Sequence, residues 1–285
     1  MTRVALLGTG VMGSRLAQNL IQAKYDLVLY NRTESKLQPL IQQGATYAAT
    51  PKAAAEQADV IISMVTNDEA SHHIWLHPET GAAQGLGENK VAIESSTLTV
   101  AWTQQLARQI SARGALFLDA PVVGSRPQAE AKGLIALVGG TAETLAIAES
   151  TLLAAGIKTI HHVGTTGQGM AMKLAVNGLF GIQVVALAEA ISMLAKSEIP
   201  REQSMTILEN LPILSPAAKL AGRLMLSGNH APLFPIDLVE KDLRYLLETD
   251  NADMPISQSA HSVYREAIAM GYGNQNITGI IQRFA

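Results

Sequence analysis

The first half of the chain alternates short apolar runs with longer segments in which apolar residues recur every three to four positions. The longer segments predict amphipathic helices, of which Met12–Ala23, Glu34–Gln43 and Val100–Arg113 are the clearest. Parallel strands need a crossover between them, so this alternation predicts an α/β fold with a Rossmann-type, doubly wound parallel sheet. The apolar runs that predict buried strands are Val4–Leu7, Leu27–Tyr30, Val60–Met64, Val91–Ile93, Leu116–Leu118, Leu134–Val138 and Lys158–His161.

The pattern changes near Gly164, where the glycine- and threonine-rich stretch GTTGQG interrupts it. Met170–Lys196 predicts one long helix that is apolar on nearly every face, and we expect it to be buried all round. We therefore expect a Rossmann domain over residues 1–163 and an all-α domain over residues 164–285 that begins with this helix. Further helices are predicted at Glu202–Asn210, Ala217–Ser227, Ile236–Asn251, Ile256–Met270 and Gln275–Phe284.

Composition narrows the class of protein. Of the 285 residues, 48% are hydrophobic and 16% charged, which is typical of a compact soluble protein. The net charge of −3 and the lack of a basic run give no indication of a nucleic-acid partner. The sequence contains no cysteine, which excludes disulfides, thiolate catalysis and Cys-ligated zinc. With no signal-peptide pattern and no uninterrupted apolar run of membrane-spanning length, we expect a cytoplasmic protein with no membrane partner.

A glycine-rich run follows the first predicted strand and opens the first predicted helix. It reads Gly8-Thr9-Gly10-Val11-Met12-Gly13, the GxGxxG spacing of dinucleotide-binding turns. The first glycine permits the tight turn, the second lets the backbone approach a pyrophosphate, and the third lets the helix pack on the strand. Free N–H groups at the positive end of the helix would hold the pyrophosphate. The run predicts a nicotinamide dinucleotide site.

The end of the second predicted strand indicates which dinucleotide is bound. A NAD site usually places an acid here for the ribose 2′-OH, but this chain has Asn31, Arg32 and Thr33. An acid would repel a 2′-phosphate, whereas a guanidinium binds one with paired hydrogen bonds. Lys36 lies one turn further on and adds positive charge. We therefore expect NADP (NADPH) as cofactor, the alternative being that Arg32 is an ordinary solvated side chain.

Several further motifs stand in an order that resembles the β-hydroxyacid dehydrogenase family, which includes 3-hydroxyisobutyrate dehydrogenase, tartronate semialdehyde reductase and glyoxylate/succinic semialdehyde reductases. The likeness covers essentially the whole chain and implies an all-α domain like the C-terminal domain of 6-phosphogluconate dehydrogenase. The motifs are the glycine run, Ser96-Thr97, Asp119-Ala120-Pro121-Val122, Gly167-x-Gly169-x-x-x-Lys173-x-x-x-Asn177 and Lys241-Asp242-Leu243.

The resemblance implies that Lys173 and Asn177 are the catalytic pair. They lie one helical turn apart and so project from the same face. Reduction of a carbonyl group places a hydride on carbon and needs a proton for oxygen, which a lysine ammonium can give and take back. The alternative is a helix lysine whose charged end reaches solvent.

The resemblance also implies cofactor contacts beyond the glycine run. Met64, Val65 and Thr66 would line the adenosine side, with plain core packing as the alternative. Thr97 would contact the nicotinamide ribose. Lys241 would face the nicotinamide or the substrate from the helical domain, or it is a surface lysine beside two acids.

Substrate contacts are implied for Ser96, Thr97, Val123, Gly124 and Ser125, together with Lys173. For the Ser96-Thr97 pair the alternative is a helix N-cap. The loop departs from the family pattern, because Val123 stands where a hydroxyl is common and Ser125 replaces a glycine. Backbone N–H groups near Gly124 could still hold a carboxylate. The departure leaves the substrate's identity open, not the reaction class.

Three functions remain in view. The expected one is NADP-dependent interconversion of a small β-hydroxyacid and its semialdehyde or keto form. An imine reductase shares the architecture but typically holds Asp or Tyr where Lys173 stands, and a non-catalytic NADP-binding scaffold would lose this lysine. The long apolar helix predicts a homodimer or homotetramer. No metal is expected, since His72, His73 and His77 lack a third ligand at a standard spacing.

Overall fold

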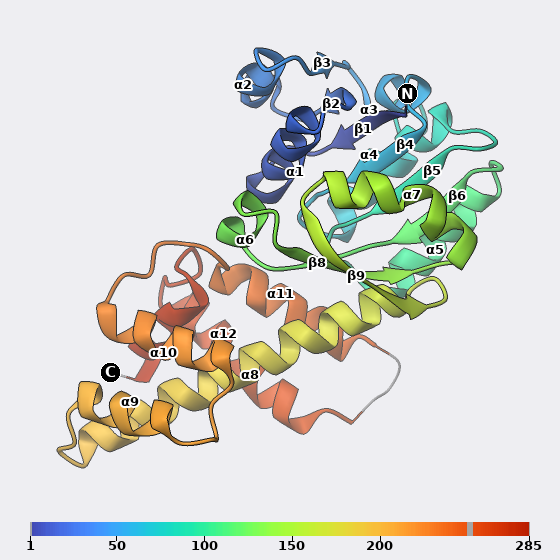
Figure 1. The fold of residues 1–285 in the computed structure, drawn as a ribbon. Coiled ribbons are helices and arrows are strands. Elements are labelled where there is room, and N and C mark those ends of the chain that lie inside the picture. Colours follow the sequence, from blue (N-terminus) through green and yellow to red (C-terminus); the bar gives the residue numbers. More distant parts are fainter. Residues whose placement is uncertain (1, 250–252, 285) are drawn as a thin grey trace. The chain divides into compact units, whose positions relative to one another are not determined.

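The computed structural model describes residues 2–249 and 253–284, which divide into two compact units (Figure 1). Unit 1 is Met1–Lys173 and unit 2 is Leu174–Ala285. The division falls inside one continuous helix, α8 (Gln168–Lys196). The expected combination of a Rossmann-type sheet with a following helical domain is confirmed.

Unit 1 is built on one sheet, with strand order β3-β2-β1-β4-β5-β6-β8-β7 and with β9 paired to β8. Neighbouring strands from β3 to β6 run parallel, whereas β8 runs antiparallel to β6 and β7. The antiparallel pairs were not expected from the sequence. The strands are β1 (Arg3–Leu7), β2 (Asp26–Tyr30), β3 (Thr46–Tyr47), β4 (Val60–Ser63), β5 (Val91–Glu94), β6 (Leu116–Asp119), β7 (Val122–Val123), β8 (Leu134–Gly139) and β9 (Ile157–Gly164).

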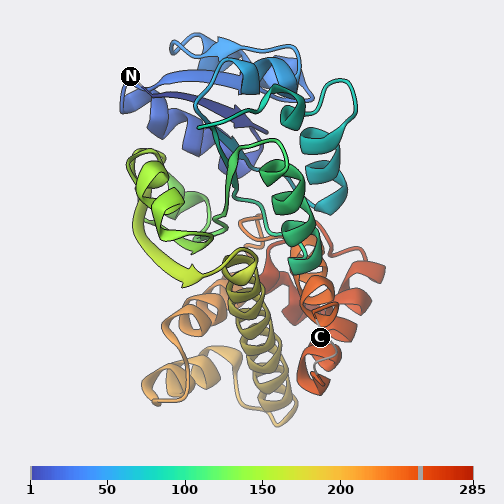
Figure 2. The same cartoon turned by 90° about the vertical axis from the view of Figure 1, so that its right-hand side faces the viewer.

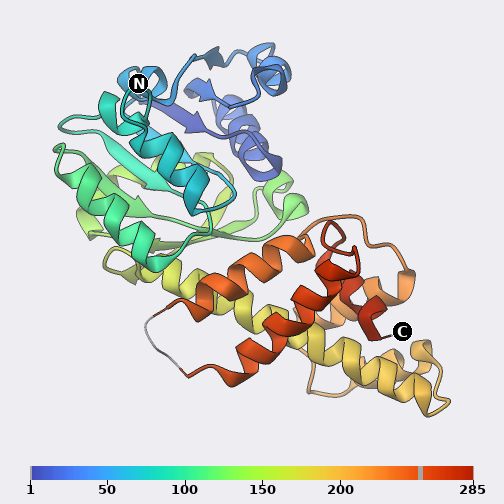
Figure 3. The same ribbon diagram turned by 180° about the vertical axis from the view of Figure 1, so that it is seen from behind.

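Helices cover both faces of this sheet, because successive side chains along each strand point to opposite sides. Val4 and Leu6 of β1 pack with α1 and α7 on one face, whereas Ala5 and Leu7 pack with α3, α4 and α5 on the other. Figure 1 shows α7 in front of the sheet, and Figure 3 shows α4 and α5 on the opposite face. The helices of unit 1 are α1 (Val11–Gln22), η1 (Glu34–Leu37), α2 (Gln38–Ile41), α3 (Pro51–Glu56), α4 (Asp68–Leu76), η2 (Ala82–Gly85), α5 (Val100–Ser111), α6 (Arg126–Glu130) and α7 (Ala142–Ala154).

Unit 2 packs its helices around the second half of α8, the long yellow helix of Figure 2. Val184, Ala188 and Ile191 of α8 are buried against residues from each of the other helices, including Tyr264. Gly178 and Gly181 let α11 approach closely, since a Cβ on Gly178 would lie 2.4 Å from Leu246 Cδ2. The other helices are α9 (Arg201–Asn210), α10 (Pro216–Ser227), α11 (Ile236–Leu247), α12 (Pro255–Ala269) and η3 (Ile277–Phe284).

The prediction that α8 is buried on every side is wrong. Met172, Leu179 and Met193 are 44%, 60% and 55% exposed, and Ala186 between them is exposed as well. These residues are apolar, so their position on an open face could not be recognised from polarity. The helix is long and apolar enough to cross a membrane, with a mean hydropathy of 1.8, but its other side forms the core of unit 2.

Other differences are local. The segment predicted as one helix over Glu34–Gln43 is the 3₁₀ turn η1 followed by the short α2, which has Pro39 in its first turn. The C-terminal segment Gln275–Phe284 forms the 3₁₀ helix η3 rather than an α-helix. The helix predicted to end at Asn251 ends at Leu247, and Asn251 itself lies outside the described residues.

Candidate functional site

The glycine run forms a tight turn between β1 and α1. Gly8 has a φ of +98°, and a Cβ there would lie 2.4 Å from Met64 O. A Cβ on Gly13 would lie 2.0 Å from Gly8 O. A Cβ on Gly10 would meet no described atom within 4 Å. Two of the glycines are therefore required by the fold, whereas Gly10 faces open space where a ligand can approach.

The N-terminus of α1 differs from those of four other helices in unit 1. Helices α3, α4, α5 and α7 begin with side-chain caps from Thr50, Asn67, Thr99 and Thr141. Helix α1 begins at Gly10 with no side-chain cap from the described residues, and it has no acid in its first turn. Backbone N–H groups and the positive end of the helix are thus left for an anion. This arrangement fits the pyrophosphate of a nicotinamide dinucleotide.

Asn31 ties the end of β2 to the glycine run. Its Oδ1 accepts a hydrogen bond from Thr9 N–H at 3.0 Å, and its Nδ2 donates to Thr33 O at 2.8 Å. Arg32, Thr33 and Lys36, which follow Asn31 in the chain, are exposed. Asn31 therefore shapes the turn, and the two cations stand at its solvent side.

The ends of β4 and β5 are joined through Ser96. Its Oγ accepts from Val65 N–H at 2.8 Å, while its own N–H donates to Glu94 at 2.9 Å. The expected alternative of a helix N-cap is wrong for Ser96 and Thr97, because Thr99 caps α5. Ser96 is 1% exposed, so its hydroxyl positions the neighbouring strand end. Thr97 is half-buried, as are Met64 and Val65, and Thr66 is exposed.

Glu94 is a fully buried acid that the sequence did not single out. Its Oε2 accepts from Ser71 Oγ at 2.8 Å and from Trp75 Nε1 at 2.9 Å. With the Ser96 N–H it thus has three donors, so the buried carboxyl oxygens are hydrogen-bonded. Trp102 joins this network, because its Nε1 donates a hydrogen bond to Ser71 Oγ at 3.0 Å. The partners lie on two helices and a loop, so no local motif could have revealed this network.

The segment expected to be a substrate loop is partly regular. Val123 lies on β7 opposite Ile135 of β8 and is half-buried. Gly124 has a φ of +123°, and a Cβ there would lie 2.8 Å from Leu134 Cδ2. Both the N–H and the Oγ of Ser125 donate to Gln128 Oε1, at 3.0 and 2.9 Å. Ser125 is thus occupied in starting α6.

Asp119 ends β6 and lies at the beginning of α8. Its Oδ1 accepts from Gly167 N–H and its Oδ2 from Met170 N–H, both at 2.8 Å. Burial raises the pKa of this carboxyl, and backbone hydrogen bonds, including those from Gly167 and Met170, oppose that rise. Lys173 follows on the same helix, is 7% exposed and is the last residue of unit 1.

Unit 2 brings Asn177 and Lys241 together through a residue that was not expected to be a site residue. Asp242 Oδ2 accepts from Asn177 Nδ2 at 2.6 Å, and Asp242 Oδ1 lies 3.1 Å from Lys241 Nζ. Lys241 is 9% exposed and its Nζ lies 5.0 Å from the centre of the Tyr245 ring. The alternative of a surface lysine is therefore wrong. The sequence signal for Asp242 was its place in the Lys241-Asp242-Leu243 motif.

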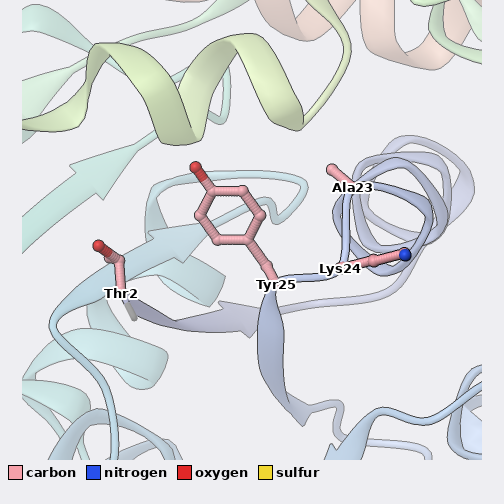
Figure 4. A pocket seen from close by; sticks show the side chains of 4 residues that line it. All are labelled: Thr2, Ala23, Lys24 and Tyr25. Atoms are coloured by element: carbon pink, nitrogen blue, oxygen red, sulfur yellow. The ribbon is translucent and has the colours of Figure 1, made fainter.

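Two other features lie apart from these groups. A pocket lined by Thr2, Ala23, Lys24 and Tyr25 lies where β1 and β2 begin (Figure 4). The glycine run is at the opposite, carboxyl end of the same strands, where ligands bind in such sheets. Within residues 2–249 and 253–284, no group of three His, Asp or Glu side chains is arranged to hold a metal ion.

Comparison with known proteins identifies both halves of the chain. The NAD-binding domain of 6-phosphogluconate dehydrogenase matches residues 3–164, and the NAD-binding domain of NADP-dependent 3-hydroxyisobutyrate dehydrogenase matches residues 167–284. The chain is 32% identical to the chloroplastic glyoxylate/succinic semialdehyde reductase 2 of Arabidopsis thaliana, over 98% of this chain and 78% of that protein. It is also 32% identical to the 3-sulfolactaldehyde reductase of Escherichia coli (strain K12), over 99% and 96%.

The fold is likewise shared with a solved structure. The 3-hydroxyisobutyrate dehydrogenase of Mycobacterium tuberculosis, solved with L-serine, has a TM-score of 0.90 and 24% identity over 99% of this chain and 98% of that one. The two domain matches account for nearly the whole sequence in the order observed in the structure. The chain therefore belongs to the β-hydroxyacid dehydrogenase family of NAD(P)-dependent oxidoreductases.

Proposed function

We propose that the protein interconverts a small β-hydroxyacid and its semialdehyde or keto form, with NADP as cofactor and Lys173 as general acid/base. The observation that carries the proposal is the near-complete burial of Lys173 on a helix whose first turn is fixed to the sheet. The nicotinamide cofactor, when bound in reduced form, would provide the hydride for the carbonyl carbon. The Lys173 ammonium donates the proton to the carbonyl oxygen, and in the oxidising direction the neutral amine takes it back.

The proposed preference for NADP rests on the solvent side of the glycine turn. Gly8, Gly10, Val11, Met12 and Gly13 would hold the pyrophosphate, as the uncapped start of α1 allows. Arg32 and Lys36 are exposed beside Asn31, where a NAD-specific site would present an acid. We propose Asn31, Arg32 and Thr33 as the 2′-phosphate contacts. Met64, Val65, Thr66, Thr97 and Lys241 are the remaining proposed cofactor contacts.

The substrate is proposed to be a short aldehyde or keto acid. Its carboxylate would be held by backbone N–H groups near Gly124 and by Thr97, with Ser96 and Ser125 shaping the surrounding backbone. The relatives named above, reductases of semialdehydes and of 3-sulfolactaldehyde, support this substrate class. The side chain of Val123 offers no hydrogen-bond donor, which favours substrates with an apolar segment over the smallest acids such as glyoxylate.

We propose that the protein works in the cytoplasm as a homodimer or homotetramer. Met172, Leu179, Ala186 and Met193 of α8 stand at intervals of seven residues and are exposed in the single chain. A line of exposed apolar residues with this spacing is typical of a helix that pairs with another. Sedimentation at micromolar concentration is expected to show no monomer, and a clean monomer would refute the assembly.

Two alternatives make different demands on Lys173. An imine reductase would typically carry Asp or Tyr there, and a non-catalytic NADP-binding scaffold would have no use for a buried lysine. No described feature favours either. Turnover with NADPH of a panel of short semialdehydes and cyclic imines separates all three functions.

The proposed role of Lys173 is tested by Lys173→Ala. Loss of the general acid is expected to lower kcat by about 10²–10⁴-fold while the affinity for NADPH stays within a few-fold. Lys196→Ala is the matched control, because this exposed lysine ends the same helix. Steady-state kinetics and fluorescence titration of NADPH provide the two readouts. A Lys173→Ala enzyme with the kcat of the control would overturn the assignment.

A further inference from the structure

Asp119 is a buried acid for which the proposed chemistry has no direct use. It is fully buried, and its two carboxylate oxygens accept hydrogen bonds from the backbone N–H groups of Gly167 and Met170. These N–H groups belong to the turn that begins α8. The residue before the helix is Gly167, which has no side chain and cannot cap the helix itself. Asp119 therefore supplies the cap from 48 residues earlier in the chain.

Two glycines leave the room that this carboxylate occupies. A Cβ on Gly139 would lie 2.5 Å from Asp119 Oδ1. A Cβ on Gly169 would lie 2.4 Å from Leu137 O and 2.9 Å from Asp119 Oδ2. The start of α8 is therefore pressed directly against the backbone of β8. We refer to Asp119, Gly139, Gly167 and Gly169 as the helix anchor.

The anchored turn is also tied to the loop that follows β5. Met170 Sδ accepts a hydrogen bond from Leu98 N–H at 3.2 Å, and Leu98 lies two residues after Ser96. Met170 is fully buried and belongs to the core on the α5 side of the sheet. The first turn of α8 thus has fixed contacts with β6, β8 and the β5–α5 loop. All of these contacts lie within unit 1.

Lys173 is three residues beyond Met170 on this helix, a rise of about 4.5 Å at the usual 1.5 Å per residue. A displacement of the first turn is therefore transmitted to the lysine's Cα without an intervening loop. Catalytic proton transfer is sensitive to such displacements, since a misplacement of about 1 Å can cost about 10²-fold in rate. We propose that Asp119 is a positioning residue of the reaction, which fixes Lys173 by capping α8 through the helix anchor. This inference rests on the proposed role of Lys173.

The first test measures kcat, KM, the Kd for NADPH and Tm for Asp119→Asn and Asp119→Ala. Asparagine keeps one acceptor and loses the second, whereas alanine loses both. We expect kcat to fall by about 10-fold in the first variant and up to about 100-fold in the second, with the Kd for NADPH changed less than about threefold. Thr141→Ala is the matched control, because Thr141 caps α7 by accepting Thr144 N–H at 3.1 Å. The control is expected to lower Tm and to keep kcat.

A second perturbation keeps Asp119 in place. Gly139→Ala forces the carboxylate to move, because the new Cβ would overlap Oδ1. It is expected to reproduce the loss of kcat, and it serves as the test if both Asp119 variants fail to fold. A normal kcat in the folded Asp119→Asn or Gly139→Ala protein would overturn the inference.

A double-mutant cycle separates positioning from a general structural effect. If Asp119 acts through Lys173, adding Asp119→Asn to Lys173→Ala should lower the residual rate by less than about threefold. If the two losses multiply in full, Asp119 acts independently of Lys173 and the inference is wrong. If Lys173→Ala alone keeps its activity, it is the proposed function that fails, and the single variant shows this directly.

Discussion

The N-termini of α1 and α8 present the same physical feature and use it in opposite ways. Both helices begin at a glycine beside the sheet, and both have N–H groups without a partner inside the helix and a partial positive charge at that end. At α1 the described residues supply no side-chain cap, and space lies open above Gly10. At α8 the carboxylate of Asp119 fills the same position. One helix end is left for a ligand anion, and the other is closed by an internal one.

The glycines around each helix end reflect this difference. A Cβ on Gly10 would meet no described protein atom within 4 Å, so the lack of a side chain leaves room for a ligand. A side chain on Gly169 would collide with the backbone of β8, so its absence serves the fold. Identical residues in similar motifs are therefore required for different reasons, and a substitution can reveal which reason applies.

Among the substitutions that test this contrast, the largest expected effect concerns the ligand anion at α1. Arg32→Asp removes a charge-assisted contact with a 2′-phosphate and adds a repulsive charge, so NADPH affinity should fall by about 100-fold or more. NADH carries no 2′-phosphate, and its affinity should change by less than about threefold. Titration of both cofactors with the unmodified protein and the variant measures the ratio. Equal use of both cofactors by the unmodified protein would contradict the preference.

The next effect sharpens the contrast between the two glycines. Gly10→Ala should leave Tm unchanged and weaken NADPH binding by about 10-fold, because its methyl group meets only the ligand. Gly169→Ala should lower stability by about 1–3 kcal/mol, because its methyl group overlaps Leu137 O. Thermal unfolding and NADPH titration of both variants check the prediction. A Gly10→Ala protein that loses stability without losing affinity would remove the distinction.

The smallest effect is a pH dependence of stability. Burial raises the pKa of the Asp119 carboxyl, so the folded protein holds this proton more tightly than the unfolded chain does. The stability contributed by this group should therefore fall as pH rises from the unfolded value, about 4, through the raised folded value. Asp119→Asn has no such proton. Urea unfolding of both proteins across the acidic range should show the unmodified protein's advantage shrinking as pH rises. A growing advantage would contradict the sign.

Much of unit 1 could be predicted from the sequence because its information is local. The strands are short apolar runs, and the glycine run carries its own spacing, so Gly8 and Gly13 lie where the motif requires them. The helix anchor could not be predicted in the same way. Asp119 belonged to a motif of the resemblance, but its partners stand about 50 residues further on, and only the folded chain brings them together.

Residue polarity also gave the wrong burial in two places, because tertiary contacts determine which side chains are exposed. Leu179 and Met193 of α8 are apolar and were expected to be buried, yet they are exposed in the single chain. Lys241 stands beside Glu240 and Asp242, a surface-like setting, yet it is buried and paired with Asp242. The type of a residue indicates which environments suit its side chain, whereas its actual environment is formed by distant parts of the chain.

The helix anchor sets a rule for chimeras made between members of this family. Asp119, Gly139, Gly167 and Gly169 all precede Leu174, where unit 2 begins. A crossover after residue 173 transplants a foreign helical unit and leaves every member of the anchor from one parent. A crossover near residue 164, where the sequence pattern changes, would combine the carboxylate and Gly139 of one parent with the helix start of the other. Recombination libraries built at the first junction should therefore yield more folded proteins than libraries built at the second.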